Sequence, residues 1–430
     1  MTMHRSIPLA ELSPGMAIDL TRRLSLADLA PFAARFGVGG AGLAARAWLA
    51  EAVATRLPGP GSNLVSEALR HHAPAAEGEA LTLRLAVLSV DAGAGTVRLA
   101  CRIAGPSGPV LSGEIEVRPP AEASLSEAIP GPAHLLPPLL ARCAGRPPVP
   151  TGIVHPVDAD SLKGALAAAE AGLIRPHLVG PEARIRAAAD AIGADISGLP
   201  MTPTEHSHAS AEAAVRLVTE GRCAALMKGS LHTDELLSAA LAREAGLRTA
   251  RRVSHCFVLA APLYPRLLLI TDAAVNINPD LKAKADIARN AIGLAQAIGI
   301  SLPRVAVLSA VETVTPEIPS TLDAAALCKM ADRGQISGGV LDGPLAFDNA
   351  VSPEAARAKG IVSPVAGIAD ILLCPDLESG NMLAKQLAYL GGAESAGILL
   401  GLRVPVALTS RADGAASRLA SAALLRLMAG

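Results

Sequence analysis

The chain has 430 residues, of which 51% are apolar and 2% are aromatic, and its formal net charge is −1. This length predicts two or three domains, and a core made mainly of Ala, Leu, Val and Ile favours helix-rich α/β layers over an all-β protein. The balanced charge provides no global basic field, which argues against nucleic-acid and anionic-membrane partners.

The six cysteines are scattered singly, most of them in apolar runs, and none forms a C-x-x-C pair. We therefore expect buried thiols in a reducing compartment rather than disulfides or zinc ligands. The first residues lack the apolar stretch of a signal peptide. Every apolar run is cut by Pro, Gly or charge before it reaches the length of a membrane span, so we expect a cytoplasmic protein.

Residues 1–120 have the pattern of a separate α+β unit. The sequence predicts a helix from Ser25 to Phe36, a Gly-rich loop over 37–42 and a second helical segment around Trp48. Antiparallel strands are predicted by alternating apolar residues over three later segments, 82–90, 97–103 and 110–117.

Residues 121–150 are rich in proline and include the runs GPAHLLPPLL and GRPPVP. Such proline density stiffens a linker and interrupts regular elements. We therefore place a linker here and expect the second domain to span residues 151–430.

From residue 151 onward, short apolar strands alternate with helices, which predicts a parallel sheet covered on both faces. Asp342-Gly343-Pro344 is expected to end the strand that contains Leu341. In such a fold the carboxyl ends of the strands share one edge, where ligands bind. The polar residues expected along that edge are Lys228, Asp272, Asp342, Asp376 and Ser410.

Lys228-Gly229-Ser230 follows a predicted strand directly and precedes a helix that starts at Thr233. A lysine, small hydroxyl residues and a helix N-terminus together favour an anion site. A surface lysine after a strand is the alternative. The glycine spacing of a Walker loop is absent.

The polar loops contain cations, hydroxyls and carboxylates, but the sequence has no His cluster for a metal, no GxGxxG and no GxSxG. This combination suits transfer of an acyl group to or from phosphate better than redox chemistry or hydrolysis.

From about residue 150 to its end, the chain resembles the phosphate acetyl/butyryltransferase family. The resemblance is carried, in order, by LMKG, RRVSHCFVL, LLLITDAAVNINPDLKAKADIARNAI, VAVLSAVE, RGQISGGVLDGPLAFDNAVSPEAARAKGI, SPVAG, ADILLCPDLESGN and LTSRAD. It implies an α/β/α fold of two subdomains, about 151–247 with 399–430 and about 248–398, with the active site in the cleft between them. It also implies a homodimer or higher homo-oligomer, and exchange between acyl-CoA plus phosphate and acyl phosphate plus CoA, without a metal or redox cofactor.

The resemblance assigns the final loop to catalysis. Ser410 and Arg411 match a Ser-Arg pair that contacts the thiol or carbonyl and the phosphate. The acetyl-type enzymes carry an Asp several residues later as a proposed thiol base, but Ser417 stands at that position here. Asp413 is the nearest substitute for the base, and a capping or pairing role is its alternative.

The family's Arg in the helix after the Lys228 loop is also missing, since no arginine lies between Lys228 and Arg243. We therefore expect phosphate to be held by Lys228, Thr233, Arg411 or a residue that the sequence does not identify. The full set of expected substrate-binding residues is Lys228, Ser230, Thr233, Asp342, Asp348 and Asn381.

Residues 1–120 resemble the MaoC-like hot-dog domain of R-specific enoyl-CoA hydratases, chiefly in the order of elements and the run VRLACRIAGPSGPVLSGEIEVRPP. Those hydratases carry an Asp and a His in the loop after the first helix, and residues 36–44 contain neither. The resemblance thus implies a hydratase-like domain that has lost its chemistry. The whole chain resembles bacterial proteins that join such a segment to a phosphate acyltransferase.

Two other functions are compatible with these patterns. One is a non-catalytic acyl-CoA-binding regulatory module, as in the similar domain of some malic enzymes. The other is a decarboxylating dehydrogenase of related architecture, for which the sequence has neither the metal-binding aspartates nor an NAD-pocket signature. The sequence does not determine the acyl chain length.

Overall fold

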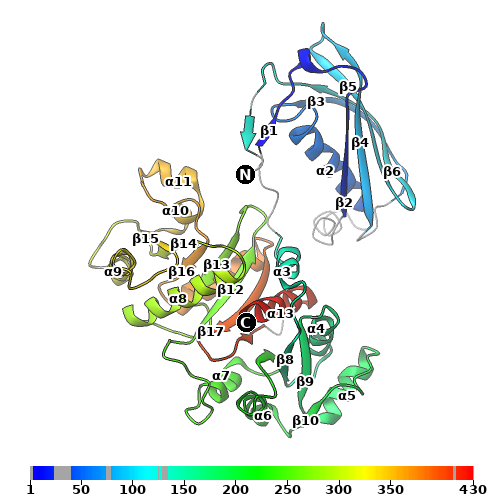
Figure 1. Ribbon diagram of the computed structural model, residues 1–430. Coiled ribbons are helices and arrows are strands. Elements are labelled where there is room, and N and C mark those ends of the chain that lie inside the picture. The colour runs from blue at the N-terminus through cyan, green and yellow to red at the C-terminus, as the bar shows by residue number, and fades with distance from the viewer. Residues whose placement is uncertain are drawn as a thin grey trace. The chain divides into compact units, whose positions relative to one another are not determined.

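The computed structural model of the chain describes residues 3–23, 40–73, 79–123, 125–127, 134–409 and 413–429. The chain divides into two compact units, residues 1–129 and 130–430, and each is described by itself (Figure 1). The predicted helix from Ser25 to Phe36 lies outside the described residues.

The N-terminal unit is a five-stranded antiparallel sheet, of order β2-β4-β5-β6-β3, wrapped around one long helix (Figure 1). A short antiparallel pair, β1 with β7, is also present. The bounds are β1 Met3–Arg5, η1 Leu9–Glu11, β2 Ala17–Arg23, α2 Gly40–Thr55, β3 Asn63–His71, β4 Ala80–Asp91, β5 Thr96–Gly105, β6 Gly108–Arg118 and β7 Leu125–Glu127.

Strand β4 shows why this sheet forms. Leu81, Leu83 and Leu85 are fully buried and alternate with outward-facing residues, which is the period of a strand with one face on a core. Trp48 of α2 lies in the same core. The three predicted strands and the α+β hot-dog arrangement are confirmed. The Gly-rich loop was predicted too long, because α2 already begins at Gly40, where the following Ala and Leu residues favour helix.

The stretch predicted as a linker contains structure that belongs to the C-terminal unit. Helix α3 (Leu136–Cys143) buries Leu139 and Cys143 in that unit's main core. Its two prolines, Pro137 and Pro138, occupy the first turn of the helix, where the missing N–H groups have no intrahelical partner to lose. Proline density therefore marked a helix start here rather than an irregular connector.

The C-terminal unit is organised on one eleven-stranded sheet of order β10-β9-β8-β11-β18-β17-β12-β13-β16-β14-β15. Its elements are β8 Val149–Val154, α4 Ala159–Glu170, β9 Ile174–Gly180, α5 Glu182–Ala191, β10 Met201–Pro203, α6 Ser207–Thr219, β11 Ala225–Lys228, α7 Thr233–Leu241, β12 Ser254–Ala260, β13 Leu267–Thr271, α8 Leu281–Ala297, β14 Arg304–Leu308, α9 Pro319–Asp332, β15 Val340–Leu345, α10 Phe347–Val351, α11 Pro353–Ala358, β16 Ile371–Leu373, α12 Leu377–Tyr389, β17 Glu394–Leu400, β18 Val406–Ala407 and α13 Ala415–Met428.

Helices cover both faces of this sheet, as the α/β prediction requires. The main core joins apolar residues of α3, α4, α5, α8, α9 and α13 to the strands. Two separate clusters lie under α6 with α7 and under α10 with α12. The α/β/α layering is therefore confirmed.

The prediction that all strand ends gather along one edge is wrong. Strands β10, β9, β8, β11 and β18 are parallel to one another, and so are β13, β16, β14 and β15. Between the two groups, β17 and β12 are paired antiparallel to each neighbour. These three successive antiparallel pairings make the two groups of strands run in opposite directions. The carboxyl ends of the first group therefore lie at the opposite end of the strands from the carboxyl ends of the second group.

The predicted strand break at Asp342-Gly343-Pro344 is also wrong, since β15 continues through these residues to Leu345. Strand β15 is the last strand of the sheet. An edge strand tolerates proline because one of its sides needs no ladder partner.

Candidate functional site

Two neighbouring loops of the first strand group meet at Lys228. The lysine ends β11 and is 3% exposed, and its Nζ donates to the Thr409 carbonyl at 3.3 Å and to the Gly229 carbonyl at 3.5 Å. Thr409 follows β18, which is paired in parallel with β11. A buried ammonium group therefore joins the predicted anion loop to the loop that leads into Ser410.

The chain after Lys228 is held close to the end of β8. Gly229 N donates to the Val154 carbonyl at 2.9 Å, and Ser230 N donates to the His155 carbonyl at 2.8 Å. A Cβ on Gly229 would lie 2.6 Å from the Val154 oxygen, so only glycine permits this approach. His155 has a φ of 58°, an uncommon conformation that turns its carbonyl group toward Ser230.

Asp158 extends this network beyond the Lys228 loop. Its carboxylate caps α4 by accepting from Ser161 N at 2.8 Å. Burial alone would raise the pKa of Asp158, but hydrogen bonds from Ser161 and Ser230 and the nearby Arg418 guanidinium outweigh burial and lower it. Asp158 is thus ionised and links the serine of one loop to an arginine of α13.

Thr233 begins α7 as predicted and is half-buried. The same first turn carries Asp234 and Glu235. The Glu235 Oε2 atom is buried without a hydrogen-bond partner, and His208 Nδ1 lies 3.6 Å from Oε1. Because acidic side chains already occupy the positive end of the helix dipole, this helix start attracts a phosphate less than the sequence pattern indicated.

Ser410 and Arg411 lie outside the described residues, but both flanks of their loop are described. On one side Thr409 contacts Lys228. On the other side the Asp413 carbonyl accepts from Arg418 Nε at 3.2 Å. Ser417 lies in α13, where its carbonyl accepts from Ser421.

Asp272, which follows β13, has a structural role and is not positioned to bind a ligand. It is 2% exposed, and its carboxylate accepts backbone N–H bonds from His255, Ala274, Val275 and Asn276 at 2.9–3.2 Å. Asn381, expected to bind substrate, donates from Nδ2 to the Ala273 carbonyl at 2.8 Å. Both side chains therefore shape the loop at the second edge of the sheet.

Asp342 and Asp348 are not brought to Lys228. Asp342 belongs to β15, the last strand of the sheet, and Asp348 belongs to α10, which follows β15 in the chain. Six strands lie between β11 and β15 in the sheet. Asp342 Oδ1 accepts from Gly343 N at 2.9 Å, and Asp348 is 3.6 Å from Lys359 Nζ. Among the described residues no contact connects either carboxylate with the Lys228 loop.

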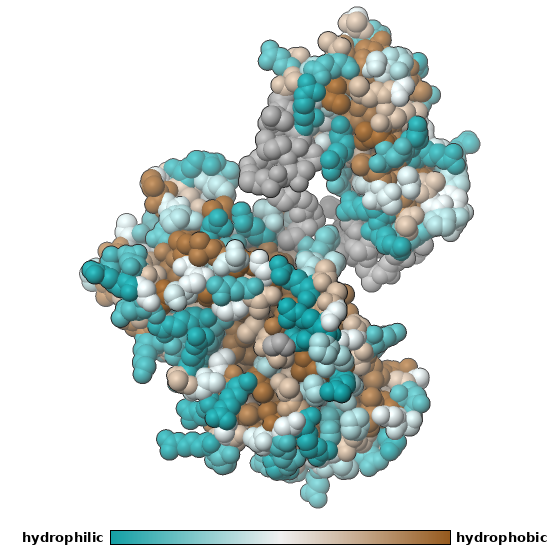
Figure 2. All heavy atoms as spheres, viewed as in Figure 1, coloured by the Kyte–Doolittle hydropathy of each residue, from teal (hydrophilic) through white to brown (hydrophobic). Residues whose placement is uncertain are grey.

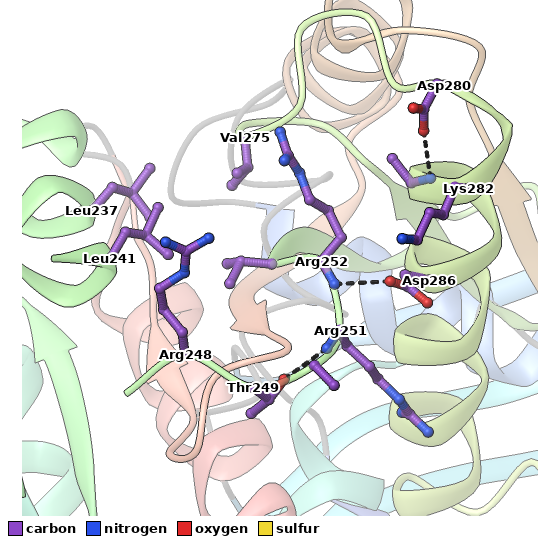
Figure 3. A pocket seen from close by; sticks show the side chains of 13 residues that line it. Leu237, Leu241, Arg248, Thr249, Arg251, Arg252, Val275, Asp280, Lys282 and Asp286 are labelled. Carbon is purple, nitrogen blue, oxygen red and sulfur yellow. Dashed lines mark hydrogen bonds between the residues drawn. The ribbon is translucent and has the colours of Figure 1, made fainter. Parts of the chain in front are cut away.

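A cavity of about 650 Å³ lies between α7 and the start of α8 (Figure 3). Leu237 and Leu241 of α7 form one wall. Four basic and two acidic side chains line the rest, and the segment 248–253 crosses the floor. The charged residues are Arg248, Arg251, Arg252, Lys282, Asp280 and Asp286.

Most of the negative charge in this cavity is already engaged. Asp286 accepts from Arg252 N at 3.0 Å and from the Arg289 guanidinium at 2.7 Å. Asp280 caps α8 through Ala283 N at 2.7 Å. The cavity therefore presents a positive, partly apolar interior that suits a ligand with both anionic and apolar parts.

The motif RRVSHCFVL carries part of the family resemblance, but its pattern alone predicted no site residue. Its two arginines, Arg251 and Arg252, line this cavity, and its histidine, His255, is buried in β12. Burial lowers the pKa of His255 to about 4, against the opposing effect of the Asp272 charge and a hydrogen bond to the Leu408 carbonyl. His255 is therefore neutral and supports the strand that leads to Thr409. A cluster of arginines just before a strand was the available signal.

Within the described parts of the chain, no three His, Cys, Asp or Glu side chains converge as a metal site. Nor does any described helix have the length and apolar character needed to cross a membrane.

Comparison with known proteins agrees with this geometry. The family described as Phosphate acetyl/butaryl transferase matches residues 204–425. A phosphate acetyltransferase of Rhizobium meliloti is 59% identical over 291 residues, 68% of this chain and 92% of the relative. A phosphate butyryltransferase of Clostridium acetobutylicum is 45% identical over 259 residues, 60% of this chain and 86% of the relative.

Among solved structures, a branched-chain phosphotransacylase from Enterococcus faecalis superimposes with a TM-score of 0.57 at 29% identity, covering 65% of this chain and 99% of that one. The matched residues 204–425 contain the Lys228 loop, the cationic cavity and the Thr409–Asp413 segment.

Proposed function

The chain belongs to the phosphate acetyl/butyryl transferase family and is a phosphate acyltransferase, and we propose that its reaction takes place where the Lys228 loop meets the loop after β18. The reaction exchanges acyl-CoA plus phosphate for acyl phosphate plus CoA. The observation that carries this assignment is the convergence of both loops on one buried ammonium group, within the residues that the family covers.

The chemistry requires a thiolate, an oxyanion contact and positive charge near phosphate. An ordinary thiol has a pKa near 8.5, so a base is needed to raise the thiolate fraction at neutral pH. In the proposed mechanism Asp413 takes the thiol proton, and Ser410 donates to the oxygen of the attacked carbonyl. Arg411 and Lys228 then neutralise the departing phosphate.

We assign the cavity between α7 and α8 to the CoA end of the substrate. CoA carries several phosphates and an apolar acyl-pantetheine arm. The arginines of segment 248–253 and Lys282 suit the phosphates, and Leu237 with Leu241 suits the arm. The assignment is supported by α7, which begins beside the Lys228 loop and ends at the cavity wall.

CoA and phosphate act here as substrates, and the proposed mechanism uses neither a metal nor a redox cofactor. All six cysteines are unpaired thiols, which supports a reducing, cytoplasmic location.

We further propose a homo-oligomer. The last strand of the N-terminal sheet, β3, is nine residues long and almost entirely exposed, including Leu64 and Val65. A long exposed edge strand is a template for pairing with another chain, and hydrophobic residues are visible between hydrophilic ones on this unit's surface in Figure 2. Size-exclusion chromatography with light scattering tests this, and a monomer at micromolar concentration would contradict it.

The activity itself is tested by phosphate-dependent release of CoA from acetyl-, propionyl- and butyryl-CoA. We expect release with at least one chain length and none without phosphate. Well-folded protein that binds these thioesters but releases no CoA would instead be a non-catalytic acyl-CoA-binding module.

A further inference from the structure

Asn276 is a buried amide that holds the side chain of one of the cavity's arginines. It is 2% exposed and lies in the loop after β13, whereas Arg252 lies just before β12. The two segments are neighbours because β12 and β13 pair antiparallel, which places the start of one strand beside the end of the other. Arg252 Nε donates to Asn276 Oδ1 at 2.6 Å. The amide therefore fixes the guanidinium of a residue that lines the cavity.

The orientation of this amide is determined by its other contacts. The Nδ2 atom of Asn276 donates to the Val253 carbonyl at 2.8 Å and to the Asp272 carboxylate. A flipped amide would place its oxygen against these two acceptors and its NH₂ group against the N–H of Arg252. Only one orientation makes all three hydrogen bonds, so Asn276 always presents an acceptor to the arginine.

Arg252 differs in this respect from the two other arginines of segment 248–253. With the residues that the structure describes, the guanidinium groups of Arg248 and Arg251 form no hydrogen bond or ion pair. Figure 3 shows the side chains of Arg251 and Arg252 pointing in opposite directions. The contact at Nε leaves Arg252 Nη1 and Nη2 without a hydrogen bond to any described residue. Both groups can therefore donate to a ligand.

We propose that Asn276 is a positioning residue that directs the Arg252 guanidinium toward a phosphate group of CoA. The proposal rests on the assignment of the cavity to CoA made above. A guanidinium held at Nε keeps its two Nη groups as a planar fork, and such a fork matches two phosphate oxygens. An arginine that is already held in place also loses less side-chain freedom when it binds. Asn276 is not one of the described residues that line the cavity, so it acts through Arg252.

Asn290 provides a matched control for the loss of a buried amide. It is 5% exposed and lies in α8. Its Nδ2 atom donates to the Arg252 carbonyl and to Ser254 Oγ, each at 2.9 Å. Asn290 thus supports the backbone of the same segment without contacting the guanidinium. A loss that comes only from a loosened segment would appear in variants of both asparagines.

The first experiment compares Asn276→Leu and Asn290→Leu in the full chain, with phosphate-dependent CoA release as the assay. Each substitution removes the amide and keeps a side chain of similar size. We expect Asn276→Leu to raise the KM for acyl-CoA about tenfold while kcat and the KM for phosphate stay within about threefold, because the contact serves substrate binding. Asn290→Leu should leave all three constants within about threefold. An equal rise in the KM for acyl-CoA in both variants, or in neither, would overturn the proposal.

The second experiment asks whether Asn276 acts through Arg252. Arg252→Met should raise the KM for acyl-CoA roughly 30-fold, since a charge-assisted contact is lost. In that background Asn276→Leu should add less than about twofold, because the group that it positions is absent. If the two effects instead multiply in full, Asn276 supports only the fold and the proposal is wrong.

Arg252→Lys keeps the test decisive if Asn276→Leu does not fold, because Arg252 is exposed and its replacement leaves the core intact. Lysine retains the positive charge but lacks both the Nε–H that Asn276 accepts from and the planar fork. We expect the KM for acyl-CoA to rise about tenfold, and a wild-type KM would overturn the inference. Absence of CoA release by the wild-type protein is a different result, since it refutes the proposed function itself.

Discussion

Lys228 and Asp272 occupy equivalent places in the sequence but different places in the chemistry of the molecule. Each is an almost fully buried charged residue at the end of a buried strand: Lys228 is the last residue of β11, and Asp272 directly follows β13. The Asp272 carboxylate is enclosed by four backbone N–H donors, whereas Lys228 bridges two loops through carbonyl oxygens. A charge after a strand thus becomes structural when its own loop folds back on it, and a site candidate when it joins two loops.

The strongest test of this contrast is Lys228→Met, which keeps the buried stem and removes the charge. We expect kcat/KM for phosphate to fall by roughly 10³-fold, because a charge-assisted contact and the anchor of Thr409 are lost together. The free energy of unfolding should change by less than about 1 kcal/mol. Steady-state kinetics and denaturant titration check this, and unchanged phosphate kinetics would remove Lys228 from the site.

Asp272→Asn should show the opposite behaviour. Replacing the carboxylate places an amide among backbone donors, which we expect to lower the free energy of unfolding by about 3 kcal/mol. The kcat per folded molecule should stay within about threefold of wild type. If instead activity is lost at full stability, Asp272 is a catalytic group and the contrast with Lys228 is wrong.

His255, between these two regions, predicts a dependence of stability on pH. Burial lowers its pKa from the ordinary value of 6.5 to about 4 in the folded protein, so as the pH falls the unfolded chain takes up a proton before the folded protein does. The contribution of the neutral ring to the free energy of unfolding is therefore fully present above about pH 6.5. It falls by up to about 3 kcal/mol as the pH drops toward 4. Chemical denaturation across this range in wild type and His255→Gln measures the effect. Parallel pH curves for the two proteins would contradict it.

Asp413→Asn tests the proposed base. We expect kcat to fall on the order of 10²-fold with little change in the KM for acyl-CoA, since proton transfer is lost and binding is kept. The loss should shrink as the pH rises toward the pKa of the thiol, because CoA then ionises unaided. A loss that is independent of pH and accompanied by a lower Tm would mark Asp413 as structural.

The smallest expected effect concerns the N-terminal unit. Because residues 36–44 contain neither the Asp nor the His of the hydratases, the full chain should hydrate crotonyl-CoA no faster than a buffer control. Steady hydration with several turnovers would show that this unit keeps its own chemistry.

Local patterns in the sequence were sufficient for the layers and for the loop at Lys228. The alternation of apolar residues predicted β4, and a strand ending in a lysine before Thr233 located the connection from β11 to α7. Local patterns do not determine the direction in which each strand runs in the sheet. The antiparallel pairing of β17 and β12 depends on which strands pair across the sheet, and it places Asp342 away from Lys228.

Arg418 and the cavity illustrate the other limit. A lone arginine in a C-terminal helix carries no sign of the two acceptors that it reaches, the Thr409 hydroxyl and the Asp413 carbonyl, and Gly164 of α4 looks like a weak helix position until the arginine stem is seen against it. The arginines before β12 were visible as a cluster, but their convergence with Leu237 and Leu241 depends on the packing of α7 near α8.

Transfer of an acyl group between CoA and phosphate by this chain can be followed in one mixture of acyl-CoA, phosphate and enzyme, with ³¹P NMR for the acyl phosphate and a parallel titration of free thiol. We expect acyl phosphate to appear in equal amount to the CoA released, and we expect acyl phosphate and CoA to be consumed together when the reaction is run from them. Thiol release without acyl phosphate, or no release at all, would contradict this transfer.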